Sequence, residues 1–114
     1  MAKRIKRSAP STEFEQQMMI AVLSLREGEV VSFGDIAAKA GRPDAPRAAG
    51  RLLATSQVDL PWWRVVYSNG KIPECNSPRQ QNRLIDEGVT IDGDRVLSSP
   101  LGRFRKGRST KKRH

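Results

Sequence analysis

The chain has 114 residues, a length typical of one domain that buries about two thirds of its unfolded surface. Cys75 is the only cysteine, which excludes an intrachain disulfide and fits a reducing compartment such as the cytosol. No apolar run approaches the length of a membrane span, and no signal-peptide core follows the basic N-terminus.

The net charge of +9 is concentrated at the two ends of the chain. Residues 8–102 carry ten cations against all 12 acids, which leaves a net charge of −2. The other 11 cations stand in two blocks without acids: Lys3, Arg4, Lys6, Arg7, Arg103, Arg105, Lys106, Arg108, Lys111, Lys112 and Arg113. Such blocks predict disordered nucleic-acid-binding arms at residues 1–10 and 98–114 around a folded domain at 11–97. A solubilising tail is the alternative.

An apolar stripe with helical spacing follows the first arm: Phe14, Met18, Val22 and Leu25. Ser11 or Thr12 can cap this helix, and Gly28 can end it. We expect the helix to belong to the core.

Two short helices joined by a glycine and proline turn come next. Ser32 as a cap predicts a helix at 35–40 that Gly41 ends. Asp44 as a cap predicts a second helix at 46–55, with a proline in its first turn. Such a pair indicates a helix-turn-helix, although many small domains contain a similar corner.

The second helix has an unusual composition, with Ala48, Ala49 and Gly50 between Arg47 and Arg51. A glycine in a helix interior costs about 0.5–1 kcal/mol against alanine. Either another surface approaches this side closely, or the small residues serve helix packing in the core.

Both tryptophans, Trp62 and Trp63, stand between Pro61 and Arg64. As a strand, this stretch would send the two indoles to opposite faces, one into the core and one toward a groove or solvent. Farther on, Asn69-Gly70, flanked by residues 65–68 and 71–72, predicts a β-hairpin.

The C-terminal third predicts a helix and a second hairpin. The helix covers 78–87, packs through Leu84 and Ile85, and ends at Gly88. The hairpin turns at Asp92-Gly93.

No catalytic or metal-binding constellation is present in the sequence. The only histidine is terminal His114, so a Cys–His or Ser–His dyad inside a fold is excluded. Cys75 follows Glu74, which does not favour a reactive thiolate. We expect no cofactor and no metal.

The segments 31–37, 46–50 and 61–65 together resemble the DNA-binding domain of O6-alkylguanine-DNA alkyltransferases, and the resemblance covers about residues 14–91. That family has Pro-Cys-His-Arg-Val at the third segment, and its cysteine takes the alkyl group from the base. Here Trp62 replaces the cysteine and Trp63 the histidine. A tryptophan at the nucleophile position is typical of alkyltransferase-like proteins. The resemblance implies a small α+β domain with a winged helix-turn-helix-like motif.

The resemblance also implies roles for single residues. Arg47 matches the finger that replaces the flipped nucleotide, with a phosphate contact as the alternative. Phe33 stands at the position of a tyrosine that pushes the nucleotide out, with a core role as the alternative. The resemblance places four small or basic residues against the minor groove: Ala48, Ala49, Gly50 and Arg51. It places Trp62 and Val65 in the lesion pocket. It makes Trp63, Arg64 and Glu87 the residues that support this pocket. The supporting asparagine of the transferases has no match.

The function implied is binding of O6-alkylguanine in duplex DNA by nucleotide flipping, without alkyl transfer, as a flag for nucleotide excision repair. We expect a monomer whose partners are damaged DNA and excision-repair proteins, with no membrane. It would lie in the cytoplasm at the nucleoid of a bacterium or in the nucleus of a eukaryote. The alternatives are a helix-turn-helix regulator or architectural protein on undamaged DNA, and an active transferase using Cys75.

Overall fold

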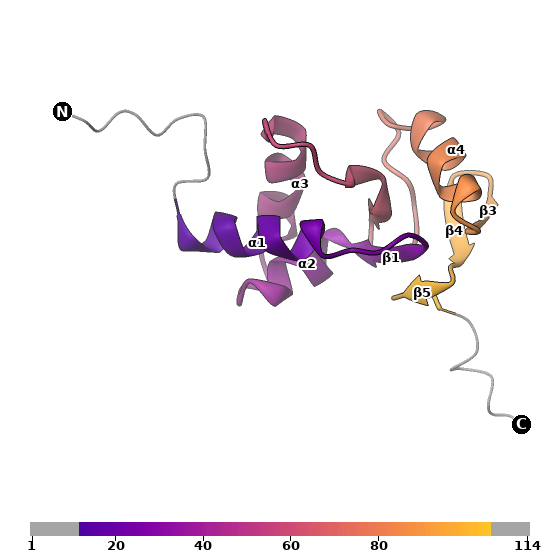
Figure 1. Cartoon of the computed structure of the whole chain (residues 1–114). Helices are drawn as coiled ribbons and strands as arrows, with labels where there is room; N and C mark the ends of the chain where they lie inside the picture. The colour runs from indigo at the N-terminus through magenta and orange to yellow at the C-terminus, as the bar shows by residue number, and fades with distance from the viewer. Residues whose placement is uncertain (1–11, 106–114) are drawn as a thin grey trace, which may run out of the picture. The chain divides into compact units, whose positions relative to one another are not determined.

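The computed structural model describes residues 12–105, which form two compact units. The helical unit comprises residues 12–24 and 33–62, and the sheet unit comprises residues 25–32 and 63–105. Figure 1 shows the helices of the first and the strands and last helix of the second. The predicted α+β class is confirmed. In the described part of the chain, no helix has the length and apolarity needed to cross a membrane.

Helix α1 (Glu13–Leu23) begins where the sequence predicts. The Oγ1 atom of Thr12 accepts a hydrogen bond from the Glu15 N–H at 3.0 Å, so Thr12 is the cap. Met18 and Val22 are fully buried, as the stripe predicts. The predicted end at Gly28 is wrong, because Ser24 already closes the helix through its N–H to the Ile20 carbonyl.

Helices α2 (Phe33–Lys39) and α3 (Pro46–Thr55) form the predicted helix-turn-helix. Gly41 ends the first helix with a φ of +93°, a left-handed conformation that favours glycine. Asp44 is not the cap of α3. Ala45 holds that position and offers no side-chain bond, so Pro46, which lacks an N–H, reduces the need for a cap.

In the sheet unit, β1 (Glu29–Ser32) lies between β2 (Val65–Val66) and β5 (Leu101–Gly102), parallel to both. The predicted hairpin around Asn69-Gly70 is therefore only a turn. The Tyr67 N–H bonds the Lys71 carbonyl at 3.0 Å and closes the turn, but β2 pairs with β1.

Helix α4 (Arg79–Asp86) and the hairpin of β3 (Thr90–Asp92) and β4 (Arg95–Ser98) agree with the sequence within a residue or two. Leu84 is buried as expected. Ile85 is 54% exposed, so its predicted core role is wrong. Because Asp92 pairs with Arg95, the turn of the hairpin is Gly93-Asp94, one residue later than predicted.

The predicted boundary of the C-terminal arm at Ser98 is too early. The Arg103 N–H bonds the Val30 carbonyl at 2.9 Å, and Phe104 packs against the core of the sheet unit. That core consists of Val30, Val66, Ile72, Leu84, Val89 and Val96. Residues 98–105 thus belong to the fold, while the predicted arm at 1–10 and the chain after 105 lie outside the described residues.

Candidate nucleic-acid interface

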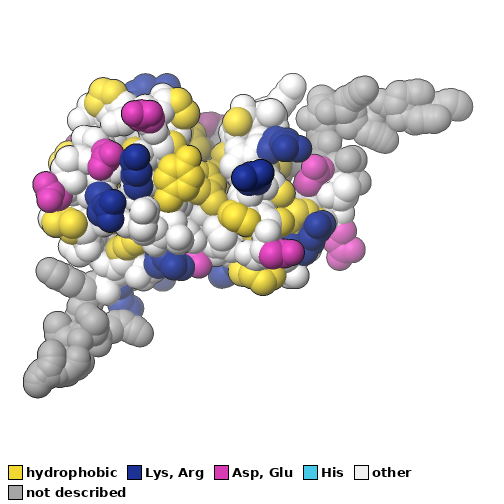
Figure 2. Space-filling view, turned by 180° about the vertical axis from the view of Figure 1, so that it is seen from behind, with side chains coloured by type: hydrophobic (Ala, Val, Ile, Leu, Met, Phe, Trp, Pro, Cys, Tyr) yellow, Lys and Arg dark blue, Asp and Glu magenta, His cyan; other side chains and the backbone are white. Residues whose placement is uncertain are grey.

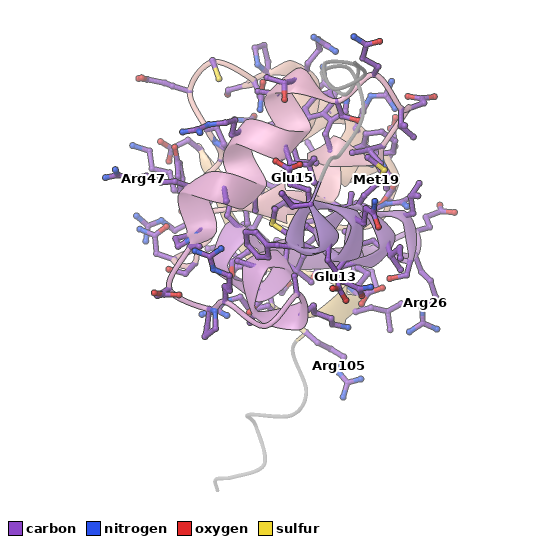
Figure 3. All side chains as sticks on the ribbon, turned by 90° about the vertical axis from the view of Figure 1, so that its left-hand side faces the viewer. Glu13, Glu15, Met19, Arg26, Arg47 and Arg105 are labelled. Carbon is purple, nitrogen blue, oxygen red and sulfur yellow. The ribbon has the colours of Figure 1, made fainter. Side chains whose placement is uncertain are left out.

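One stripe of α3 carries two arginines and two small residues. Arg47, Gly50, Arg51 and Ala54 follow helical spacing, and all except half-buried Gly50 are exposed. The Arg47 side chain points outward from the helix (Figure 3). Small side chains next to two guanidinium groups suit a helix that approaches a phosphate-lined groove closely.

This stripe differs from the predicted set at three positions. Ala49 is fully buried in the core of the helical unit, so its predicted role in DNA contact is wrong. Ala48 turns toward a hollow between α1 and α3. Ala54 belongs to the stripe and was missed, although its spacing of seven residues from Arg47 places both residues on the same face of a helix.

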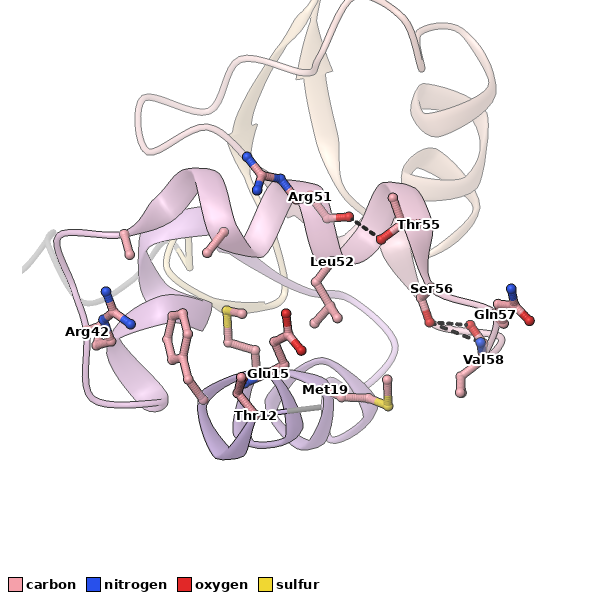
Figure 4. A pocket seen from close by; sticks show the side chains of 14 residues that line it. Thr12, Glu15, Met19, Arg42, Arg51, Leu52, Thr55, Ser56, Gln57 and Val58 are labelled. Atoms are coloured by element: carbon pink, nitrogen blue, oxygen red, sulfur yellow. Dashed lines mark hydrogen bonds between the residues drawn. The ribbon is translucent and has the colours of Figure 1, made fainter. Parts of the chain in front are cut away.

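The hollow has a volume of about 480 Å³ (Figure 4). Polar and apolar side chains both line it, and among them the guanidinium of Arg42 lies 4.7 Å from the ring centre of Phe14. Arg51 and Thr55 contribute from α3, where the Thr55 hydroxyl donates to the Arg51 carbonyl at 2.8 Å. The sequence did not predict this hollow.

Phe33 begins α2 and lies beside the stripe. A Cβ added to Gly50 would meet two carbons of the Phe33 ring at 3.9 Å, an ordinary contact distance. The ring is half-buried, so one part packs in the unit while another part is accessible. Both roles considered for Phe33 are therefore compatible with its place.

Trp62, Trp63 and Arg64 form a turn of 3-10 helix, so the predicted strand is wrong here. The Trp62 N–H donates to the Leu60 carbonyl at 2.7 Å and closes a tight turn around Pro61. The backbone is therefore not extended at this point. Both indoles are half-buried, and neither is committed wholly to the core. The strand follows at Val65.

Glu87 at the end of α4 joins the predicted supporting residues into one cluster. Its carboxylate accepts from Trp63 Nε1 at 2.8 Å and from Arg64 Nη2 at 2.7 Å. It also accepts from the Gly28 N–H at 2.8 Å. Arg64 completes the link by donating to the Leu25 carbonyl at 3.0 Å.

Two opposing effects determine the pKa of Glu87. Burial alone would raise the pKa, because it disfavours the charged carboxylate. The hydrogen bonds from Arg64, Gly28 and Trp63 outweigh burial and lower the pKa below its ordinary value. Glu87 is therefore a firmly ionised anchor of the turn.

Two guanidinium groups of the sheet unit lie close to the Trp63 ring. That of Arg83 is 4.3 Å from the ring centre and that of Arg64 is 5.2 Å away. Such cation–π contacts contribute about 0.5–1 kcal/mol each at exposed sites. Sequence reasoning missed Arg83, although it precedes Glu87 by one helical turn.

Gln80 is a second residue that the sequence did not reveal. It is fully buried, and its Nε2 atom donates to the carbonyls of Trp63 at 3.0 Å and Val65 at 2.9 Å. Val65 itself is 1% exposed. The two carbonyls on either side of Arg64 thus share one donor group.

The remaining chemistry of the described residues is limited. Cys75 is an exposed free thiol. Residues 12–105 contain no group of three or more potential metal ligands. They hold 12 cations and 12 acids, and on the face in Figure 2 basic side chains lie among acidic and hydrophobic ones. The surplus of positive charge lies in the chain on either side of residues 12–105.

A helix-turn-helix whose second helix exposes an arginine-bearing stripe of small residues is typical of a DNA-binding domain. Residues 13–89 match the family described as 6-O-methylguanine DNA methyltransferase, DNA binding domain. The chain belongs to this family.

Relatives of two kinds are found. The chain is 37% identical to the DNA base-flipping protein of Escherichia coli, over 81% of this chain and 73% of that protein. It is 33% identical to Alkyltransferase-like protein 1 of Schizosaccharomyces pombe, over 69% and 79%. It is 36% identical to a methylated-DNA–protein-cysteine methyltransferase of Saccharomyces cerevisiae, over 54% of this chain and only 34% of that enzyme.

Solved structures agree with these relatives. The crystal structure of S. pombe Atl1 in complex with damaged DNA containing O6-carboxymethylguanine superposes with a TM-score of 0.64 and 31% identity, over 74% of this chain and 83% of that one. The O6-methylguanine methyltransferase of Mycobacterium tuberculosis gives a TM-score of 0.59 and 30% identity, over 68% and 50%. The chain thus spans half of that enzyme.

Proposed function

We propose that this protein binds O6-alkylguanine in duplex DNA, flips the nucleotide out of the stack, and releases it without removing the alkyl group. The observation that carries the proposal is Trp62, which stands at the nucleophile position of a family that the chain otherwise matches. One relative is a DNA base-flipping protein, and another has been solved in complex with damaged DNA. Both support the same class of ligand for this protein.

The stripe on α3 is the proposed docking surface. Gly50 and Ala54 allow close approach to the minor groove, and Arg51 is placed for a phosphate contact. Exposed Arg47 is the proposed finger, because a planar guanidinium can stack in the vacated position and bond the orphaned base. Phe33 assists from the start of α2.

The lesion would meet Trp62. An indole offers a stacking surface worth roughly 1–3 kcal/mol for a nucleobase. Damaged bases pair poorly, and this lowers the cost of extruding them. In this proposal, selectivity comes from the contact with Trp62, while cations outside residues 12–105 contribute general affinity for phosphates.

Alkyl transfer is not part of the proposal, because it requires a thiolate and a base to form it. Trp62 supplies no thiolate. Trp63 donates its N–H to Glu87 but has no second ring nitrogen that could accept a proton. We further propose that the protein binds DNA as a monomer and that the bound complex directs nucleotide excision repair proteins to the lesion. This would take place at the nucleoid of a bacterium or in the nucleus of a eukaryote.

Titration of matched duplexes with and without one O6-methylguanine tests the proposal. We expect tighter binding of the lesion duplex and an unchanged base after release. Equal affinity for both duplexes would instead favour a regulator or architectural protein that reads undamaged DNA.

A further inference from the structure

The sheet unit extends beyond the stretch that matches the family, which ends at residue 89. The extension is folded: β3 and β4 form a hairpin, and β5 pairs with β1. It carries three exposed cations, Arg95, Arg103 and Arg105. None of them belongs to the stripe on α3, so the proposed function leaves them without a role.

Arg95 lies against the turn at residues 67–71. An isolated β-bridge joins Arg95 to Lys71, so the two residues are neighbours across antiparallel backbone segments, with their side chains on one face. Gly70 leaves room for the arginine, because a Cβ added to Gly70 would lie 3.3 Å from Arg95 Cγ. The stem of the Arg95 side chain therefore packs on the turn itself.

Arg103 reaches the same turn from β5. Because β2 and β5 are both parallel to β1, their carboxyl ends lie at one edge of the sheet, where Val66 leads into the turn and Gly102 leads into Arg103. Arg103 Nε donates to the Ser68 carbonyl at 3.2 Å. Three cations from three segments thus surround one turn. We call this set the basic turn surface: Lys71, Arg95 and Arg103, with exposed Ser68 and Asn69 in the turn.

Two acids lie beside the basic turn surface but do not cancel its charge. Asp92 is paired with Arg95 in the hairpin, and Asp94 Oδ2 lies 3.9 Å from Lys71 Nζ. The side chains of that ion pair are 58% and 45% exposed, and an exposed pair is weak enough to exchange partners. The positive charge also continues along the chain, because Arg105, which points outward in Figure 3, is followed by five cations and no acid.

We infer that the basic turn surface is a second DNA-contact site, which binds phosphates of the DNA backbone. Arginine, lysine, serine and asparagine side chains supply most phosphate contacts in protein–DNA interfaces, and the surface presents all four types. An acidic protein is the alternative occupant, but the family of the chain is one of DNA-binding domains, which favours DNA. The inference rests on the DNA-binding part of the proposed function and not on lesion recognition, because phosphate contacts carry no information about the base.

Four single variants, each of which changes the charge by one, test the surface. Arg95→Gln and Arg103→Gln remove a cation and keep a hydrogen-bond donor. Asp94→Asn removes the acid beside Lys71. Arg26→Gln is the matched control, because the Arg26 side chain is 72% exposed and the residue precedes β1, at the opposite end of the parallel sheet from the turn.

The readout is the affinity of the full chain for an undamaged duplex, titrated over a series of salt concentrations. Arg95→Gln and Arg103→Gln should each flatten the log–log salt slope by about 0.9, because each gives up one phosphate, and should weaken binding at fixed salt by about threefold or more. Asp94→Asn should tighten binding, a change that damage to the fold would not produce. Arg26→Gln should change neither quantity.

Slopes in Arg95→Gln and Arg103→Gln equal to that in Arg26→Gln would overturn the inference, and they are the result expected if the surface binds an acidic protein. The same titrations with one O6-methylguanine in the duplex separate this inference from the proposed function. Equal affinity for both duplexes together with flattened slopes would refute lesion recognition and support the second DNA contact. A lesion preference with unchanged slopes would do the reverse.

Discussion

Trp63 donates its indole N–H to Glu87 Oε2 at 2.8 Å. The resemblance to the alkyltransferases predicts that these two positions correspond to a histidine and to the glutamate that orients it. A histidine bound in this way could take a proton through its second nitrogen, whereas an indole has none. The pair now holds a turn in place.

Glu87→Gln should destabilise the protein strongly. The substitution removes the anion from a largely buried ion pair with Arg64, whose Nη2 lies 2.7 Å from the carboxylate. Removal of one partner of a buried pair costs about 3–5 kcal/mol, and we expect the lower end because both side chains keep some exposure. Urea unfolding at pH 7 measures the change, with exposed Asp86→Asn as the control.

The contribution of Glu87 should also depend on pH. Its pKa is lowered in the folded protein, so its stabilisation is fully present above the ordinary carboxylate pKa and is lost as the pH falls through the folded pKa. The difference in unfolding free energy between the unmodified protein and Glu87→Gln should therefore shrink on acidification below about pH 4. A difference that widens toward acid would contradict this sign.

Gly50→Ala should stabilise the fold and weaken DNA binding. The added methyl group would lie 3.9 Å from the Phe33 ring without a clash, and alanine is favoured in a helix by about 0.5–1 kcal/mol. The same methyl group would add bulk to the face of α3 that is proposed to approach the minor groove of DNA. We expect a higher melting temperature together with at least about fivefold weaker binding to every duplex, or about 1 kcal/mol.

A matched pair of variants checks that bulk is the cause. Ala54→Leu adds volume at the far end of the exposed stripe and should weaken binding in the same way. Ala38→Leu adds it at an exposed position of α2 outside the stripe and should have little effect. Similarly weakened binding in both variants would show that the stripe is not the docking surface.

Arg47→Ala and Arg51→Ala should differ in kind. As the proposed finger, Arg47 would fill the vacated position only when a base is flipped, so its removal should lower affinity for the lesion duplex at least about tenfold, or about 1.4 kcal/mol. Arg51 is the proposed phosphate contact, so its removal should act evenly on lesion and undamaged duplexes and reduce the salt dependence. Equal, small effects at fixed salt would exclude a finger role for Arg47.

What the sequence predicted is local, and what it missed depends on distant pairing. Helix α3 carries its own start and end within ten residues, and its predicted bounds are confirmed. Strand β5 has two residues and no periodicity of its own, and it exists because Gly102 pairs with Val30, 72 positions earlier. No pattern within residues 98–105 could indicate that partner.

The candidate site divides in the same way. Arg47, Trp62 and Glu87 could be predicted because their types and spacing match a known family. Gln80 and Arg83 were missed because their partner is the turn at 62–64, which a loop separates from α4 in the sequence. A buried glutamine cannot be told from a surface glutamine until the packing of the helix is known.

The chain after Arg105 should control general affinity and not selectivity. It carries five cations and no acid, so its deletion should flatten the log–log salt slope by about 0.9 for each DNA phosphate that these cations neutralise. The cut must fall after Arg105, because Arg103 and Phe104 belong to the sheet unit. Salt-dependent titration should show that affinity falls by similar factors for both duplexes. A deletion that abolished only the lesion preference would contradict this.

The last prediction concerns the missing nucleophile. Trp62→Cys alone should stay inactive, because a thiol with a pKa near 8.5 would lack a base to activate it. Trp62→Cys with Trp63→His recreates the Pro-Cys-His-Arg segment, and Glu87, which already accepts a hydrogen bond from position 63, could orient the new imidazole. We expect at most weak self-methylation, since removal of two indoles leaves cavities beside Arg83 and the supporting asparagine of the transferases is absent.

Intact-protein mass spectrometry after incubation with O6-methylguanine DNA measures this self-methylation. The control is the triple variant Trp62→Cys, Trp63→His and Glu87→Gln, which should lose any self-methylation that the double variant shows. The addition of one methyl group to the unmodified protein would overturn the non-enzymatic proposal.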